Sequence, residues 1–83
     1  MAAVKARVVF DSSEKNRLIE SYGPDSFTET QDGLRFEFGF TSMDYLVSWL
    51  LGFGDKVKVL EPANVAENIR DTAKKIFSRY KQT

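Results

Sequence analysis

The 83-residue chain contains no cysteine and no histidine. Without cysteine, disulfides, iron–sulfur clusters and thiolate zinc sites are excluded. The lack of histidine removes the side chain used most often as a general base and as a transition-metal ligand. The 12 acidic and 12 basic residues cancel, so the chain as a whole has no net attraction for nucleic acid or anionic lipid. We therefore expect no enzymatic activity and no cofactor, and any anion binding must depend on local separation of charge.

Long hydrophobic runs and targeting signals are also missing. No apolar run approaches the roughly 20 residues that cross a membrane, and the start of the chain does not resemble a signal peptide. We expect a cytoplasmic protein with no membrane partner. Because Met1-Ala2-Ala3 leads directly into a strand pattern, we also expect a piece of a longer protein. What the chain does have is 42% hydrophobic residues with seven Phe, enough for one core in a single domain over residues 1–83.

The densest apolar stretch lies within residues 45–62. It begins with a predicted helix, capped by Thr41 or Ser42, whose apolar residues cover nearly the whole circumference. These residues are Leu46, Val47, Trp49, Leu50, Leu51 and Phe53. One sheet face cannot bury them all, so we predict two packing partners for this helix. Its aromatic residues are either buried beneath the last helix or contact a second subunit or neighbouring domain, for which the candidates are Tyr45, Trp49 and Phe53.

The remaining elements follow from periodicity and turn residues. Alternation of apolar and polar residues predicts strands over 4–10, 26–31, 34–40 and 57–60. Asp32-Gly33 indicates a tight hairpin turn, and Gly23-Pro24 ends the first helix. The last helix is predicted over 63–80, with an apolar stripe made by Val65, Ile69, Ala73, Ile76, Phe77 and Tyr80. Its opposite face is basic and is interpreted as a solvated surface that complements the helix dipole: Arg70, Lys74, Lys75, Arg79 and Lys81.

This order predicts an α+β fold, a ferredoxin-like β-α-β-β-α-β two-layer sandwich with an additional C-terminal helix. Right-handed crossovers around the central hairpin give the strand order 4-1-3-2, with two helices on one face of an antiparallel sheet. The predicted core consists of Val8, Phe10, Leu18, Ile19, Phe36, Phe38, Leu46, Leu50, Val57 and Val59.

The open face of this sheet is predicted to display four basic residues against one acidic residue, Glu37. The basic residues are Lys5, Arg7, Arg35 and Lys58. Such an excess would suit a phosphate or a nucleic acid backbone, but it also occurs on ordinary polar sheet faces. The aromatic residues of the third strand point to the core, so base stacking on the open face is not expected. No phosphate-binding loop, metal-ligand spacing or nucleophile pattern is present, and we expect no metal site.

The stretch from Asp32 to Pro62 resembles the C-terminal extension domain, called WCX, of bacterial WYL-domain transcriptional regulators of the YafY-like helix-turn-helix group. The similarity lies in the Asp-Gly turn, the pattern over Trp49–Gly54, the strand V-x-V-L-E-P at 57–62, and Tyr80 near the end of the last helix. One departure is Val65-Ala66, where family members often have Leu-Arg. If that arginine contacts a ligand in relatives, this chain lacks the contact.

The resemblance implies a longer regulator with a DNA-binding N-terminal winged helix and a ligand-sensing WYL domain, neither of which lies in these residues. It implies a regulatory and dimerisation module that docks on other domains of the same regulator and forms a homodimer. DNA would then be bound only through the missing N-terminal domain. The alternative left open by the residues is a small-ligand or nucleic-acid-binding module that uses the basic sheet face.

Overall fold

The computed structural model describes residues 4–81. Its elements, in order, are β1 (Val4–Phe10), a short 3-10 helix η1 (Ser12–Glu14), α1 (Lys15–Tyr22), β2 (Phe27–Thr30), β3 (Gly33–Phe40), α2 (Met43–Leu51), β4 (Val57–Glu61) and α3 (Ala63–Tyr80). Every strand and helix that the sequence predicts is present, with strand boundaries shifted by a single residue where they differ.

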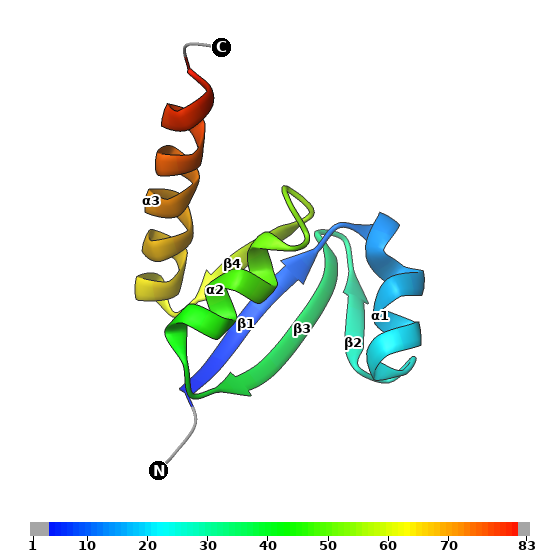
Figure 1. The fold of residues 1–83 in the computed structure, drawn as a ribbon. Helices are drawn as coiled ribbons and strands as arrows, with labels where there is room; N and C mark the ends of the chain where they lie inside the picture. Colours follow the sequence, from blue (N-terminus) through cyan, green and yellow to red (C-terminus); the bar gives the residue numbers. More distant parts are fainter. Residues whose placement is uncertain (1–3, 82–83) are drawn as a thin grey trace.

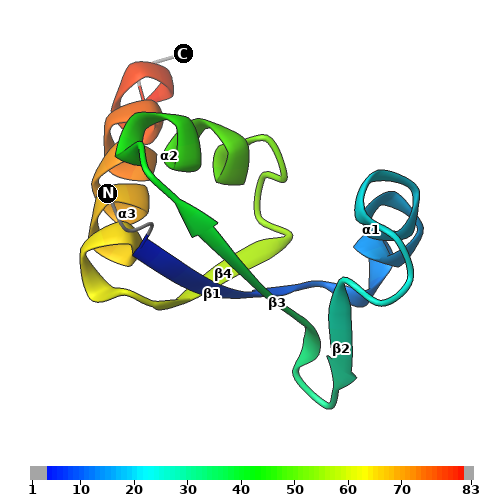
Figure 2. The same ribbon diagram turned by 90° about the horizontal axis from the view of Figure 1, so that it is seen from below.

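The four strands form one antiparallel sheet in the order β2-β3-β1-β4. β1 pairs with β3 along its whole length, from Val4 opposite Phe40 to Phe10 opposite Leu34. Counted from the other edge, this is the predicted order 4-1-3-2, so the prediction of an α+β two-layer sandwich is confirmed. α1 and α2 lie on the same face of the sheet, and α3 lies beside the β4 edge (Figure 2).

The β2–β3 turn depends on Gly33. This residue has φ of 135°, a conformation that side-chain-bearing residues rarely adopt, and a Cβ at this position would collide with the carbonyl oxygen of Phe10. The Thr30 hydroxyl supports the turn, since it accepts a hydrogen bond from the amide of Asp32 at 3.2 Å and donates one to the carbonyl of Gly33 at 3.1 Å. The predicted Asp32-Gly33 hairpin therefore sets the pairing of β2 with β3.

Of the two predicted caps for α2, Thr41 and Ser42, the structure has Ser42 at the cap position. The Ser42 hydroxyl accepts a hydrogen bond from the Tyr45 amide at 3.3 Å, and Asp44 stands in the first turn, where a negative charge complements the helix dipole. One side of α2 packs on the sheet through Leu46 and Leu50, which are each 1% exposed. α3 packs against another side, so the prediction of two partners for this helix is confirmed.

The core lies between the sheet and the helices. Its buried members are Ala6, Val8, Phe10, Leu18, Leu34, Phe36, Leu46, Val47, Leu50, Phe53 and Val65. Six of the ten predicted core residues are among them, whereas Ile19, Phe38, Val57 and Val59 are only partly buried. Phe38 lines an open groove, and the two valines line a cleft between β4 and α3. Phe38 and the two valines pack against the core as predicted, but at its margins, where the helices do not fully cover the sheet.

α3 is covered along its first half only. Val65 is fully buried and Ile69 is partly buried against β4 and α2. The second half projects past the sheet (Figure 1), and there the predicted stripe continues into solvent, with Ile76 45%, Phe77 68% and Tyr80 69% exposed.

Candidate functional site

The open sheet face carries the four predicted basic residues, and all four are exposed. Lys5 Nζ lies 3.1 Å from one carboxylate oxygen of Glu37, and Arg7 Nε lies 2.8 Å from the other. Arg7 also contacts Glu61, with Nη1 3.2 Å from the carboxylate. Most of the positive charge on β1 is therefore already paired within the sheet.

Arg35 is paired as well, since its Nη2 lies 3.2 Å from the Asp32 carboxylate in the neighbouring turn. Lys58 is the one basic residue of this face without an ion pair in the part of the chain that the structure describes. The predicted ratio of four bases to one acid is corrected, because Asp32 and Glu61 also contribute. A register shift between Arg7 and Val8 in the β1–β4 pairing brings Glu61 opposite Arg7, and strand alternation alone does not reveal such a shift.

The pKa of Glu37 also indicates that the basic residues of this face are paired with acidic ones. Hydrogen bonds from Lys5 and from Arg7 lower the pKa of Glu37 below its ordinary value. The carboxylate therefore stays ionised to lower pH and keeps its two basic neighbours neutralised. An anion that binds here must first compete with these ion pairs.

Trp49 of α2, and Phe53 in the turn that follows α2, face α1 and the sheet, and not α3 as burial beneath the last helix would require. Phe53 is only 8% exposed, with its ring centroid 4.7 Å from that of Phe10, and the Arg17 guanidinium of α1 lies 4.2 Å above it. Phe53 is thus part of the core and offers no surface to a partner. Trp49 is partly buried, and its indole N–H donates to the Tyr22 hydroxyl of α1 at 3.1 Å. Tyr45 alone of the three interface candidates is highly exposed, at 71%.

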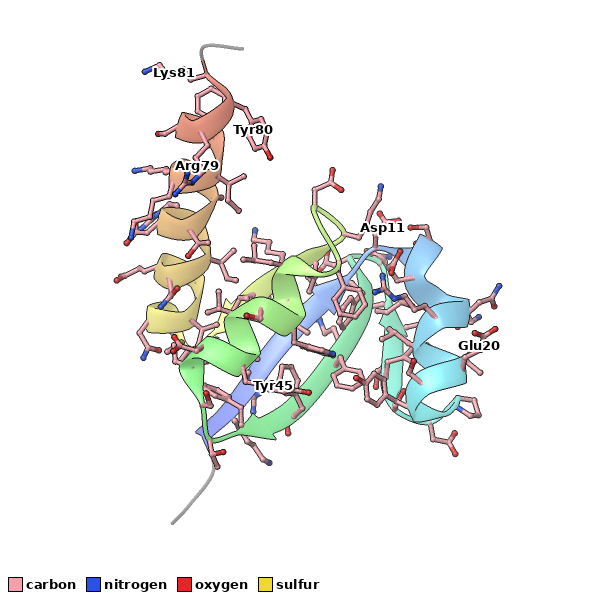
Figure 3. All side chains as sticks on the ribbon, in the orientation of Figure 1. Asp11, Glu20, Tyr45, Arg79, Tyr80 and Lys81 are labelled. Carbon is pink, nitrogen blue, oxygen red and sulfur yellow. The ribbon has the colours of Figure 1, made fainter. Side chains whose placement is uncertain are left out.

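An open groove lies between the end of α1, the C-terminal half of β3 and the first turns of α2. We call it the aromatic groove; it has a volume of about 420 Å³ and is lined by Tyr22, Phe36, Phe38, Gly39, Phe40, Thr41, Ser42, Tyr45, Leu46 and Trp49. Figure 3 shows Tyr45 on the first turn of α2, above the end of β3. The alternation of β3 predicts that its phenylalanines lie in a closed core, whereas Phe36, Phe38 and Phe40 line this groove. The available signal was that aromatic alternation continues to Phe40, beyond the reach of an α1 of eight residues.

Charge is separated between the two sides of the molecule. Residues 11–32, which include α1 and β2, contain six acidic and two basic residues, a formal charge of −4; we call this segment the acidic end. Residues 63–81, which include α3, contain five basic and two acidic residues, a formal charge of +3, and form the basic end. The two ends lie at opposite edges of the sheet, the acidic end at the β2 edge and the basic end at the β4 edge (Figure 1). Glu20 lies on the outer side of α1, and Arg79 and Lys81 lie at the tip of α3 (Figure 3).

Two other kinds of site were sought over residues 4–81. No helix in this range is long and apolar enough to span a lipid bilayer. Nor does the range bring three or more acidic side chains together as ligands for a metal ion.

The comparison against protein families covers the stretch from Asp32 to Pro62 and most of the remaining chain. The WCX domain model matches residues 2–77, which is nearly the whole chain. The chain belongs to the WCX domain family. The resemblance stated from the sequence is thereby confirmed, and membership indicates a regulatory module of a larger protein. No curated protein sequence matches this WCX domain.

Proposed function

We propose that this WCX domain is the C-terminal regulatory module of a cytoplasmic WYL-family helix-turn-helix transcription regulator, acting by domain docking and self-association and not by catalysis. The observation that carries the proposal is the uncovered apolar stripe on the second half of α3. Ile76, Phe77 and Tyr80 are between 45% and 69% exposed. A stripe of large apolar residues at helical spacing normally packs on another element, so this surface fits a protein partner.

Charge separation favours a second copy of the chain as that partner. The stripe is set in the basic end, and the same molecule carries the oppositely charged acidic end on its other side. Two copies related by a two-fold axis and arranged antiparallel place each basic end beside the partner's acidic end. Such complementarity fixes the orientation and accelerates association more than it raises affinity. The apolar stripe then supplies most of the stabilisation.

The open sheet face is the weaker candidate for function. Three of its four basic residues are engaged in ion pairs, which leaves Lys58 as the least compensated positive charge. A nucleic acid strand on this face would meet little free positive charge and no aromatic side chain from β3.

The proposal is tested by light scattering over a series of protein concentrations. The wild type is expected to change from monomer to dimer in the micromolar range at low salt. Phe77→Ala should weaken dimerisation by about tenfold or more, because a central aromatic residue of an interface contributes about 2 kcal/mol. The matched control is Tyr45→Ala, which removes an equally exposed aromatic side chain outside the stripe and should leave dimerisation unchanged. A wild type that stays monomeric at millimolar concentration, or equal losses in both variants, would contradict the proposal.

A further inference from the structure

The aromatic groove has the size and lining of a site for a small molecule. Its volume of about 420 Å³ lies within the usual range of ligand sites, roughly 300–1,000 Å³. Six of its ten lining residues are aromatic. Two of the walls, Phe38 and Trp49, meet at an interplanar angle of 66° with ring centroids 4.8 Å apart. Flat aromatic surfaces at such an angle offer both face and edge contacts to a third ring.

None of the residues within 4–81 that line the groove is charged. An ionised ligand would therefore lose hydration on entry without gaining a counter-charge, which is unfavourable. The same feature distinguishes the groove from the open sheet face, where ionised groups dominate. The lining thus selects for an uncharged molecule.

The hydrogen-bonding groups of the groove further restrict the chemical class of ligand that it can bind. The Trp49 indole N–H, which could otherwise serve a peptide carbonyl, already donates to the Tyr22 oxygen at 3.1 Å. The Ser42 hydroxyl accepts a hydrogen bond from the Tyr45 amide as the cap of α2. Both hydroxyls still have their own hydrogen, since a hydroxyl donates one bond in addition to those it accepts, and that of Tyr22 lies beside Trp49. The groove therefore offers a donor to an acceptor on the ligand.

We propose that the aromatic groove binds a small, uncharged, planar aromatic molecule that carries a hydrogen-bond acceptor. The ring packs against the surface that Phe38 and Trp49 form together, the acceptor takes the hydrogen bond of the Tyr22 hydroxyl, and Tyr45 covers the ligand from the solvent side. Tyr45 is suited to this role because it is 71% exposed at the rim and lines the groove. This proposal does not depend on self-association through α3.

The test uses the full chain and four probes of similar size. Trp49 is the single tryptophan, so its fluorescence and its one indole N–H resonance report on this groove. The probe that fits is 2-acetylnaphthalene, which is flat, neutral and has one carbonyl. The matched probes are 2-ethylnaphthalene without the acceptor, naphthalene-2-sulfonate with a negative charge, and 2-decanone without the ring. We expect saturable binding of the ketone at about 0.1–1 mM and at least tenfold weaker binding of the sulfonate and of 2-decanone.

Three variants connect the binding to the groove. Tyr45→Ala should weaken ketone binding about fivefold, the loss of one aromatic contact. Tyr22→Phe should weaken ketone binding about threefold relative to 2-ethylnaphthalene, because it removes the donor to the ketone, whereas the accompanying loss of the acceptor for the Trp49 indole N–H affects both probes. Phe77→Ala is the control, since it removes an exposed aromatic residue outside the groove and should change nothing.

Several outcomes would overturn the proposal. One is ketone binding that is unsaturable, or that Tyr45→Ala leaves intact. Another is a loss of binding in Phe77→Ala as large as in Tyr45→Ala. A third is a shift of the indole resonance by a proline-rich peptide or by oligothymidine when the ketone causes none, because the groove would then belong to a macromolecule. Dimerisation is measured separately by light scattering, so failure here leaves the proposed function untouched.

Discussion

α2 and α3 are both rich in apolar residues, yet α2 is enclosed and α3 is half bare. α2 has nine residues and lies over the sheet with α3 alongside, which buries Leu46, Val47 and Leu50. α3 has 18 residues, about 27 Å at 1.5 Å per residue, and starts beside a five-residue strand of about 17 Å. Its second half therefore projects beyond the strand, and Ile76 and Phe77 are exposed there. The comparison shows that coverage of a helix depends on matched lengths and not only on how apolar the helix is.

The largest expected effect is on the free energy of unfolding, and it tests whether α2 is buried and the second half of α3 is exposed within one monomer. Leu50→Ala should lower the free energy of unfolding by about 2–5 kcal/mol, because it leaves a cavity in the core. Ile76→Ala, at an exposed position of α3, should change it by less than about 0.5 kcal/mol. Urea denaturation at a concentration where the protein is monomeric measures both. Equal losses would show that the second half of α3 is covered within one chain.

A smaller effect, on dimerisation, tests which surface of a second copy the exposed half of α3 contacts. Reversing charge on the basic end with Lys75→Glu and Arg79→Glu should weaken dimerisation about tenfold, since acidic groups then face the partner's acidic end. The double variant Glu20→Lys and Asp25→Lys at the acidic end should weaken it similarly.

Mixing the two double variants pairs the glutamates introduced at one basic end with the lysines introduced at the partner's acidic end, while the other contact keeps its natural charges. The mixture should therefore regain dimerisation close to that of the wild type, as measured by sedimentation or light scattering. If each double variant alone dimerises as the wild type does, or if the mixture dimerises no better than either variant alone, the acidic end is not the surface that α3 contacts.

The smallest effect concerns the open sheet face, which is exposed like the second half of α3 but whose charged side chains form ion pairs with one another. The pKa of Glu37 is lowered in the folded protein by Lys5 and Arg7, so its contribution to stability is present above the ordinary carboxylate pKa and is lost as the pH falls through the lowered value. Glu37→Gln should make the unfolding temperature slightly less sensitive to pH between neutral and acidic conditions. A variant with the same acid sensitivity as the wild type would show that these exposed ion pairs contribute nothing measurable.

The sequence was sufficient where structure is determined by neighbouring residues. Alternation set the faces of β1 and β3, Asp32-Gly33 set the β2–β3 hairpin, and residue type limited the cap of α2 to Thr41 or Ser42. The sequence was insufficient where distant elements meet. Phe53, in the turn after α2, faces α1 because Arg17 and Phe10 complete that packing, which no local pattern contains.

The same limit explains the missed groove and the miscounted charges. Whether Phe38 is enclosed depends on how far α1 extends over the sheet, and not on the alternation that places its side chain on the helix side. The pairing of Glu61 with Arg7 depends on an irregular register between β1 and β4. Both are properties of the assembled layers.

The strand order also determines how the molecule avoids uncontrolled aggregation. β2 is the sheet edge beside α1 (Figure 1), and a strand edge without a strand partner is a template for adding strands from other chains. It has only four residues, and Glu29 within it and Asp25 and Asp32 beside it are acidic. Two such edges repel each other and offer few backbone groups for pairing. Open-ended growth of the sheet into fibrils is thus disfavoured, and contacts between copies are left to the side chains of the helices.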